Sequence, residues 1–160
     1  MLASNSTLAI ALQPAGLRHA RTITRLSKRC FGPDAWSILD VIAMLLLPST
    51  VTFRVLDGPR LVGFAALRHR RRRNMAWITT LCVDADYRQQ GIGSQLLQAC
   101  EAASAPLPRI RLTVQVGNQP ALALYRKFGY DTLWRIPRYY SSGADGFEME
   151  KWIAAAPKPG

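Results

Sequence analysis

The residues with the clearest chemical potential lie in one stretch, where an apolar run leads through an acidic turn to a glycine-rich corner. The apolar run is Leu81-Cys82-Val83, and the corner is Arg88-Gln89-Gln90-Gly91-Ile92-Gly93-Ser94, at the start of a helical pattern. The first amides of a helix have no partner within the helix, and the helix dipole adds partial positive charge there. Glycine leaves the backbone open to an approaching anion. The corner therefore predicts a pyrophosphate-binding site.

Two other nucleotide-binding patterns do not fit this corner. A P-loop needs Gly-Lys-[Ser/Thr], which does not follow here. A dinucleotide fingerprint needs a third glycine, and Leu96 stands at that position. A helix start that merely contains glycine is the alternative for the corner on its own.

A second stretch combines a helix cap with a phenol. Asn118 precedes a helical pattern over 119–128, and a capping role alone explains its residue type. Tyr125 lies within that pattern, and its hydroxyl is a proton donor at neutral pH. Judged from spacing alone, Tyr125 is a core tyrosine beside Ala121 and Leu122.

The elements that position these residues follow from the apolar spacing. Strand patterns cover 7–13, 50–55, 61–68, 75–83, 109–116, 130–136 and 146–153, and helical patterns cover 17–30, 35–47, 92–103 and 119–128. Asp57-Gly58 predicts a hairpin turn, and Asp34 is the predicted cap of the second helix. This order predicts an α/β (α+β) protein with a mixed central β-sheet flanked by helices on both faces.

Length and composition indicate a single domain. The 160 residues form one predicted domain, 1–160, with a core over about 7–153 and a frayed tail over 154–160. The three cysteines show no CxxC spacing, so we expect a reduced, cytoplasmic protein without a disulfide framework. The apolar run 8–12 is too short for a signal or a membrane span. The sequence contains no cluster of His and Cys residues of the kind that would indicate a metal site.

The net charge of +11 favours acidic ligands, nucleic acid or the ribosome as neighbours, and a solvated basic surface explains it equally well. The basic run His69-Arg70-Arg71-Arg72-Arg73 lies at a predicted hairpin turn, where water readily solvates its charge. Few aromatic residues interleave with it, unlike in a platform for single-stranded nucleic acid. RNA or ribosome contact through this run stays open as an alternative.

Together, the corner and the second stretch resemble the GNAT acetyltransferase family. Residues 88–93 match its [Arg/Gln]-x-x-Gly-x-[Gly/Ala] signature, and residues 118–130 match its Asn-x-x-Ala-x-x-Leu-Tyr-x-x-x-Gly-[Phe/Tyr] helix. The resemblance spans roughly 17–153 and implies the GNAT fold, acetyl-CoA as co-substrate, no metal, and acetyl transfer to an amine. The C-terminal part of the chain, with Arg138-Tyr139-Tyr140, Ala144-Asp145 and Met149, resembles RimI-type protein N-terminal acetyltransferases.

This resemblance implies a role for each matching residue. The implied cofactor-binding residues are Leu81, Cys82, Val83, Arg88, Gln89, Gln90, Gly91, Ile92, Gly93, Ser94, Asn118 and Tyr125. Tyr125 is the implied general acid for the leaving thiolate, and an amide near Leu81 or Val83 polarises the thioester carbonyl. Tyr139 and Tyr140 are the implied contacts of the first residues of a peptide acceptor.

The implied general base is where the chain departs from the family. RimI-type enzymes carry a Glu five residues before the Asn, and that position is Thr113 here. A further acidic position of the wider family, on the strand before the corner, is Thr79. Threonine is no base near pH 7, so we expect deprotonation through a water held by Thr79, Thr113 or backbone carbonyls. An α-amine, with a pKa of about 8, needs less help than a lysine at about 10.4.

The function that the resemblance favours is an acetyl-CoA-dependent N-acetyltransferase. The expected acceptor is the α-amine of a protein or peptide N-terminus, which attacks the thioester directly. One alternative is a small-molecule amine acetyltransferase. Another is a non-catalytic acyl-CoA-binding module that contacts RNA or the ribosome through the arginine turn. The oligomeric state stays open.

Overall fold

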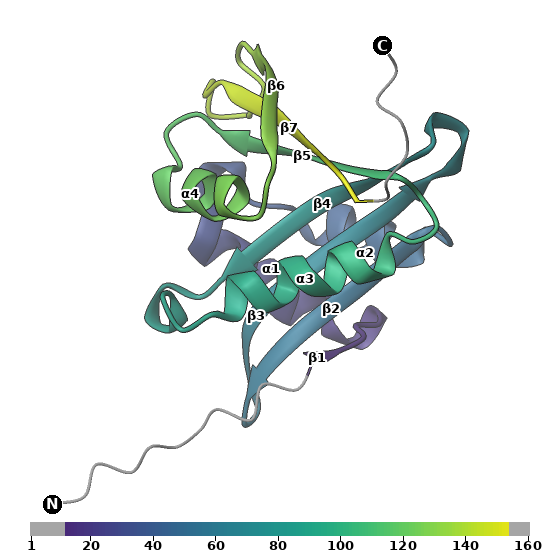
Figure 1. Ribbon diagram of the computed structural model, residues 1–160. Helices are drawn as coiled ribbons and strands as arrows, with labels where there is room; N and C mark the ends of the chain where they lie inside the picture. The colour runs from purple at the N-terminus through teal and green to yellow at the C-terminus, as the bar shows by residue number, and fades with distance from the viewer. Residues whose placement is uncertain (1–11, 154–160) are drawn as a thin grey trace, which may run out of the picture.

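The computed structural model describes residues 12–153, and Figure 1 shows a central sheet with helices on both of its faces. The helices are α1 (Ala20–Phe31), α2 (Ile38–Leu46), α3 (Ile92–Ala103) and α4 (Gln119–Lys127). The strands are β1 (Leu12–Gln13), β2 (Thr50–Asp57), β3 (Arg60–Arg70), β4 (Met75–Val83), β5 (Arg109–Gln115), β6 (Asp131–Ile136) and β7 (Gly146–Trp152). The predicted mixed sheet between two helical layers is confirmed.

The seven strands form one sheet in the order β1-β2-β3-β4-β5-β7-β6. Among these described strands, β4 and β5 run parallel, and the other neighbouring pairs are antiparallel. A parallel pair needs a long crossover connection, and α3 supplies it. In Figure 1, α1 and α2 lie behind the sheet, and α3 and α4 lie in front of it.

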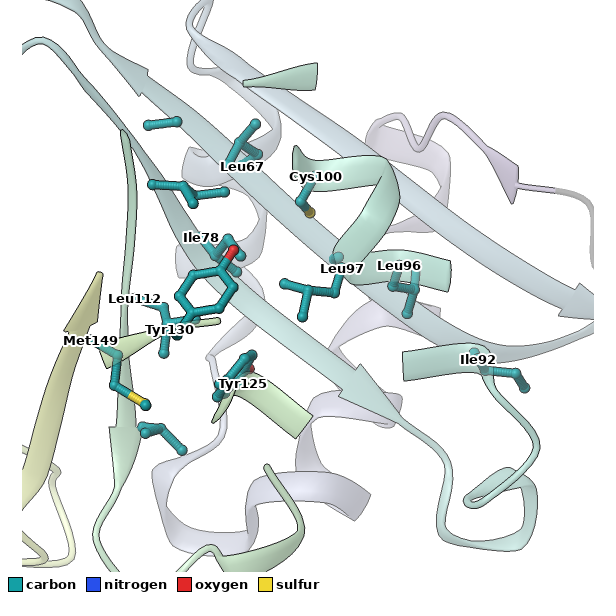
Figure 2. Packing of buried hydrophobic residues seen from close by; sticks show 14 of the residues in the cluster. Leu67, Ile78, Ile92, Leu96, Leu97, Cys100, Leu112, Tyr125, Tyr130 and Met149 are labelled. Carbon is teal, nitrogen blue, oxygen red and sulfur yellow. The ribbon is translucent and has the colours of Figure 1, made fainter. Parts of the chain in front are cut away.

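Each helical layer closes its own apolar core against the sheet. One core joins α3 and α4 to the strands; Figure 2 shows Leu96, Leu97 and Cys100 of α3 near Leu67 and Ile78. The other joins α1 and α2 to the opposite face of β3 and β4. Strand residues on alternate sides therefore face different helices.

A bulge in β4 changes this alternation. Ala66 of β3 pairs with Thr80, and the next residue, Leu67, pairs with Ile78, so Thr79 is an extra residue on β4. Before the bulge Ile78 faces the α3 core, and after it Cys82 faces the α1 core. A bulge bends its strand and redirects the side chains beyond it.

The parallel pairing of β4 with β5 is short. It comprises Ala76 with Ile110 and Trp77 with Arg111, and stops just before the bulge. Beyond that point the two strands diverge, as Figure 1 shows. Among the described strands, the second half of β4 therefore has no neighbour on that side.

The predicted bounds 75–83 and 92–103 match β4 and α3 at both ends. The predicted helix 17–30 begins as a 3-10 turn, Leu17–His19, before α1. Of the predicted strand 7–13, only Leu12 and Gln13 lie within the described residues, and the tail 154–160 lies outside them. Within the described range, no helix is long and apolar enough to cross a membrane.

The predicted cap of the second helix is wrong. Asp34 ends a 3-10 turn, Gly32–Asp34, and α2 starts only at Ile38. Ser37 caps α2 instead, by accepting a hydrogen bond from the Asp40 amide at 3.1 Å while Asp40 accepts one from the Ser37 amide at 3.0 Å. This reciprocal capping box satisfies two amides, whereas Asp34 alone would satisfy one. The Asp34 carboxylate is thus left for contacts elsewhere.

Candidate functional site

A cleft of about 340 Å³ lies where β4 and β5 diverge. Its walls come from β4, β5, α4, the end of α1 with the connection to α2, the turn at Arg88 and the loop between β6 and β7. Its lining includes the predicted site residues Thr79, Leu81, Arg88, Thr113, Asn118, Tyr125 and Tyr140. Folding therefore brings together seven residues that the sequence placed on five separate segments.

The β4 wall carries the bulge. The cleft is lined by the four residues directly after Trp77, the last residue of β4 that pairs with β5: Ile78, Thr79, Thr80 and Leu81. The Cys82 side chain is buried in the α1 core, so only its backbone is left for a ligand in the cleft. Val83 ends the strand, and its carbonyl accepts a long hydrogen bond of 3.4 Å from Arg88 Nε. This contact places Arg88 beside the strand end.

The glycine corner adopts the backbone that its residues predict. Gly91 has φ of 82°, and Gln89 also has a positive φ of 61°. Gly91 caps α3 without a side-chain hydrogen bond, and the Gln95 amide bonds the Gly91 carbonyl at 3.0 Å. The amides of Ile92 to Ser94 precede that bond and point out of the helix end. Ile92 packs its side chain into the core, which anchors the corner. The corner thus has the backbone geometry of a helix N-terminus of the kind that binds anions.

An ion-pair network fixes the turn before the corner. Asp84 caps the 3-10 turn Ala85–Tyr87 by accepting a hydrogen bond from the Asp86 amide at 3.2 Å. Arg29 and Arg60 each lie 3.0 Å from Asp84 Oδ2. Burial alone would raise the pKa of Asp84, but the Asp86 amide and the two arginines outweigh it and lower that pKa. Asp84 is therefore an anion that ties α1 and β3 to the corner.

Tyr125 lies in the α4 wall and is only 6% exposed. Figure 2 shows it beside Tyr130, whose ring it meets edge-on with centroids 5.8 Å apart. Burial raises the pKa of Tyr125, so its hydroxyl keeps its proton at neutral pH. Asn118 caps α4 by accepting a hydrogen bond from the Ala121 amide at 3.3 Å, and it also lines the cleft. The predicted cap is confirmed.

The two threonines lie on opposite walls. Thr79 is on β4, and Thr113 is on β5 opposite Glu148 of β7. Within the described residues, the buried Thr113 hydroxyl has no hydrogen-bond partner. A buried hydroxyl without a partner is costly, which makes this atom a candidate contact for a bound molecule or water.

The two neighbouring tyrosines have different surroundings. Tyr140 lines the cleft, and burial raises its pKa, with smaller effects from Tyr139 and Asp34. Tyr139 is 48% exposed and does not line the cleft; its ring meets that of Tyr140 edge-on at 5.0 Å. Tyr140 is thus the one placed to touch a molecule in the cleft, and Tyr139 supports it from outside.

Sequence reasoning missed part of the wall. Cys30, Phe31, Asp34, Trp36 and Gln115 also line the cleft. The pattern of the break Phe31-Gly32-Pro33-Asp34 indicates only the end of one helix and the cap of the next. The signal that could have pointed to this part of the wall is an acidic residue, Asp34, two positions before Trp36 and between two predicted helices. Among the described residues that line the cleft, Asp34 is the only one with a carboxylate.

The described residues contain no group of three or more His, Cys, Asp or Glu side chains that could hold a metal ion. The side chains that line the cleft instead offer hydroxyls, one guanidinium and one carboxylate. The arrangement can hold an anion at the corner, an extended chain along β4, and a proton at Tyr125.

Comparison with known proteins matches residues 20–130 to a family described as the acetyltransferase (GNAT) family. The chain is 32% identical over 124 residues to N-alpha-acetyltransferase RimI of Mycobacterium tuberculosis, covering 75% of this chain and 77% of that protein. It is 31% identical over 110 residues to the catalytic subunit of the N-terminal acetyltransferase B complex of Arabidopsis thaliana, covering 64% of this chain. The match spans 63% of that subunit's length, less than two thirds.

Solved structures show the same fold. The ribosomal-protein alanine N-acetyltransferase of Escherichia coli aligns with a TM-score of 0.79 at 20% identity, over 93% of this chain and 97% of that one. Arabidopsis thaliana NAA60 in complex with acetyl-CoA aligns with a TM-score of 0.78 at 18% identity, over 91% and 99%. At these identities the likeness concerns the fold.

Proposed function

The chain belongs to the GNAT acetyltransferase family, and from this premise we propose that it transfers the acetyl group of acetyl-CoA to the α-amine of a protein or peptide N-terminus. The observation that carries the proposal is the cleft between the diverging β4 and β5. It joins Arg88, beside the anion-binding corner, to Tyr125 and Tyr140 in one lined volume.

We assign cofactor binding to three parts of the chain. The amides of Gln89 to Ser94, with Arg88, bind the pyrophosphate at the start of α3. The free side of β4, from Thr79 to Val83, binds the extended part of the cofactor, because its backbone groups there have no strand partner. Asn118 contacts the cofactor from α4. When bound, acetyl-CoA supplies an acetyl group activated as a thioester.

We assign the two proton transfers of the reaction to Tyr125 and to the two threonines of the cleft. Tyr125 is the proton donor for the departing thiolate, because it lines the cleft and its hydroxyl is protonated at neutral pH. On the acceptor side, Thr79 and Thr113 hold a water that takes up the amine proton. An α-amine, with a pKa of about 8, is partly uncharged at neutral pH and needs only this weak assistance.

Two observations support a peptide acceptor over a small amine. The α1–α2 connection and Tyr140 enlarge the cleft beyond the cofactor strand. The relatives at 31–32% identity bear the names of acetyltransferases of protein N-termini. We further propose one domain over 1–160 and a cytoplasmic location, as expected for an enzyme that acts on new protein N-termini.

The decisive experiment is acetyl transfer from acetyl-CoA to a library of peptides with varied first residues, read by mass spectrometry. A panel of small amines and a measurement of CoA binding serve as controls. We expect acetylation at the α-amine with a preference among first residues. Transfer only to small amines would support the alternative acceptor. CoA binding without any transfer would favour a binding module.

RNA contact is a second candidate function, and the β3–β4 hairpin favours it. Within residues 12–153, a hollow of about 510 Å³ is lined by Arg68, His69, Arg70, Arg71, Arg72 and Arg73. In the part of the chain that the structure describes, none of these arginines forms an ion pair. Arg70 stacks over Trp77 at 4.5 Å. Unpaired guanidinium groups bind phosphates, and such binding weakens steeply with salt.

A further inference from the structure

The Asp34 carboxylate joins three segments that are far apart in the chain. Its Oδ1 accepts a hydrogen bond from the Ser142 amide at 2.8 Å. Its Oδ2 accepts hydrogen bonds from Ser142 Oγ at 2.7 Å and from Gln115 Nε2 at 2.6 Å. We call Asp34, Gln115 and Ser142 the Asp34 bridge; Asp34 and Ser142 are 108 residues apart.

The Asp34 bridge connects two parts of the cleft wall. Asp34 lies in the α1–α2 connection, which Trp36 fixes to α1 through a 2.9 Å hydrogen bond from its amide to Ser27 Oγ. Ser142 lies in the β6–β7 loop, in the turn that Tyr140 begins: the Gly143 amide bonds the Tyr140 carbonyl at 2.8 Å. The bridge therefore sets the position of Tyr140 relative to the connection.

Gln115 adds the strand to this arrangement. It lies on β5 two residues after Thr113, so the two side chains leave the same face of the strand. Asp34 and Gln115 both line the cleft. The bridge thus lies at the cleft itself, next to the wall that carries Thr113, rather than on a remote surface.

Other contacts of the loop do not replace the bridge. Asp145, at the far end of the loop, bonds the Arg138 amide at 2.8 Å and Arg135 Nε at 2.7 Å. These bonds hold the loop to β6, and the Asp145 carbonyl accepts a hydrogen bond from the Val116 amide at 3.1 Å, just after β5. In the described residues, the hydrogen bonds between the loop and the α1–α2 connection are those of Asp34.

We propose that Asp34 is a positioning residue that holds the β6–β7 loop and Tyr140 over the acceptor end of the cleft. This inference rests on the proposed function for its kinetic consequence, since the acceptor is the molecule that the loop would contact. The cofactor corner lies on other elements and is unaffected. Asp34 acts here through geometry, as an acceptor of three hydrogen bonds, and not as a proton acceptor.

The side-chain chemistry provides a sharp test of that distinction. Asparagine has nearly the shape of aspartate and can rebuild the bridge. Its oxygen accepts from the Ser142 amide, and its NH2 group donates to Ser142 Oγ and to the oxygen of a flipped Gln115 amide. Asp34→Asn therefore removes the charge but keeps the connection, whereas Asp34→Ala removes both.

The experiment measures the steady-state kinetics of peptide acetylation at the α-amine. It compares wild type, Asp34→Ala and Asp34→Asn. We expect Asp34→Ala to raise the KM for the peptide by about tenfold or more, because the hydrogen bonds to a charged group are removed. The KM for acetyl-CoA should stay within about twofold. Asp34→Asn should return the KM for the peptide most of the way to the wild-type value and leave the pH profile unchanged.

Asp40→Ala is the matched control. Asp40 belongs to the same region and also bonds a serine, Ser37, but it does not line the cleft. It should leave the peptide KM near that of wild type. An equal rise in Asp40→Ala would overturn the proposal, because any loosening of this region would then have the same effect. A loss in Asp34→Asn as large as in Asp34→Ala, with a shifted pH profile, would overturn it as well, because the charge would then matter.

Hydrogen exchange gives a readout that does not depend on activity. The Ser142 amide donates to Asp34, so its exchange should quicken in Asp34→Ala and stay protected in Asp34→Asn and Asp40→Ala. Unchanged protection in Asp34→Ala would refute the bridge even if the chain proves to transfer nothing. Conversely, quickened exchange without any acetyl transfer would retain the bridge and reject the proposed function.

Discussion

Arg29, near the end of α1, lies 3.0 Å from the carboxylate of Asp84, directly before the glycine corner. The Asp84 side chain is only 4% exposed, whereas that of Arg29 is 52% exposed. The pair therefore connects the helical layer on one face of the sheet to the turn that leads into α3. We therefore expect the geometry of the glycine corner to depend on this contact, although neither residue belongs to the corner.

Asp84→Asn should destabilise the protein by about 1–3 kcal/mol, less than a fully buried pair, because Arg29 and Arg60 can be hydrated. Since the pKa of Asp84 is lowered in the fold, its contribution is present above about pH 4 and is lost as the pH falls below that value. Denaturant unfolding at several pH values should therefore show a difference from wild type that shrinks in acid. Asp86→Asn, which removes a 72% exposed partner of Arg60, is the control.

Tyr125→Phe should lower kcat by about a hundredfold or more, because the thiolate then leaves without its proton donor. CoA binding, measured by calorimetry, should persist. Tyr130→Phe is the matched control: its ring lies beside that of Tyr125, and among the described residues its buried hydroxyl has no hydrogen-bond partner. Unchanged turnover in Tyr125→Phe would remove this residue from the mechanism.

Gly91→Ala should weaken CoA binding. A side chain at φ of 82° is strained by roughly 1–2 kcal/mol, and relief of that strain would turn the corner amides away from the pyrophosphate. Gly143→Ala carries the same kind of strain, at φ of 87°, in the β6–β7 loop. Calorimetry should show weaker CoA binding only for Gly91→Ala. Equal affinities in the two variants would argue against the corner as the anion site.

Replacing Arg71, Arg72 and Arg73 with alanine tests the RNA candidate. These residues are exposed and lie outside the cleft, so acetyl transfer should continue at the rate of wild type. If the hairpin binds RNA, the dependence of log affinity on log salt should flatten by about 0.7 to 0.9 for each phosphate that the variant no longer neutralises. An identical slope in wild type and variant would leave these arginines as a solvated turn.

Local chemistry explains what could be predicted from the sequence. The bounds of β4 and α3 followed from apolar spacing and from the glycines between them, because both signals act over a few residues. The capping role of Asn118 followed for the same reason. The family motifs combine such local signals, so the amino-acid sequence by itself determined the fold and the residues of the corner.

Only the tertiary structure decided how the walls of the cleft come together. The early end of the β4–β5 pairing, the bulge at Thr79 and the pairing of Thr113 with Glu148 depend on strand register, which spacing within one strand does not specify. Asp34 fits the pattern of a helix cap because its own neighbours allow one. Its partners lie 81 and 108 residues away, and only the folded chain brings them within hydrogen-bond distance.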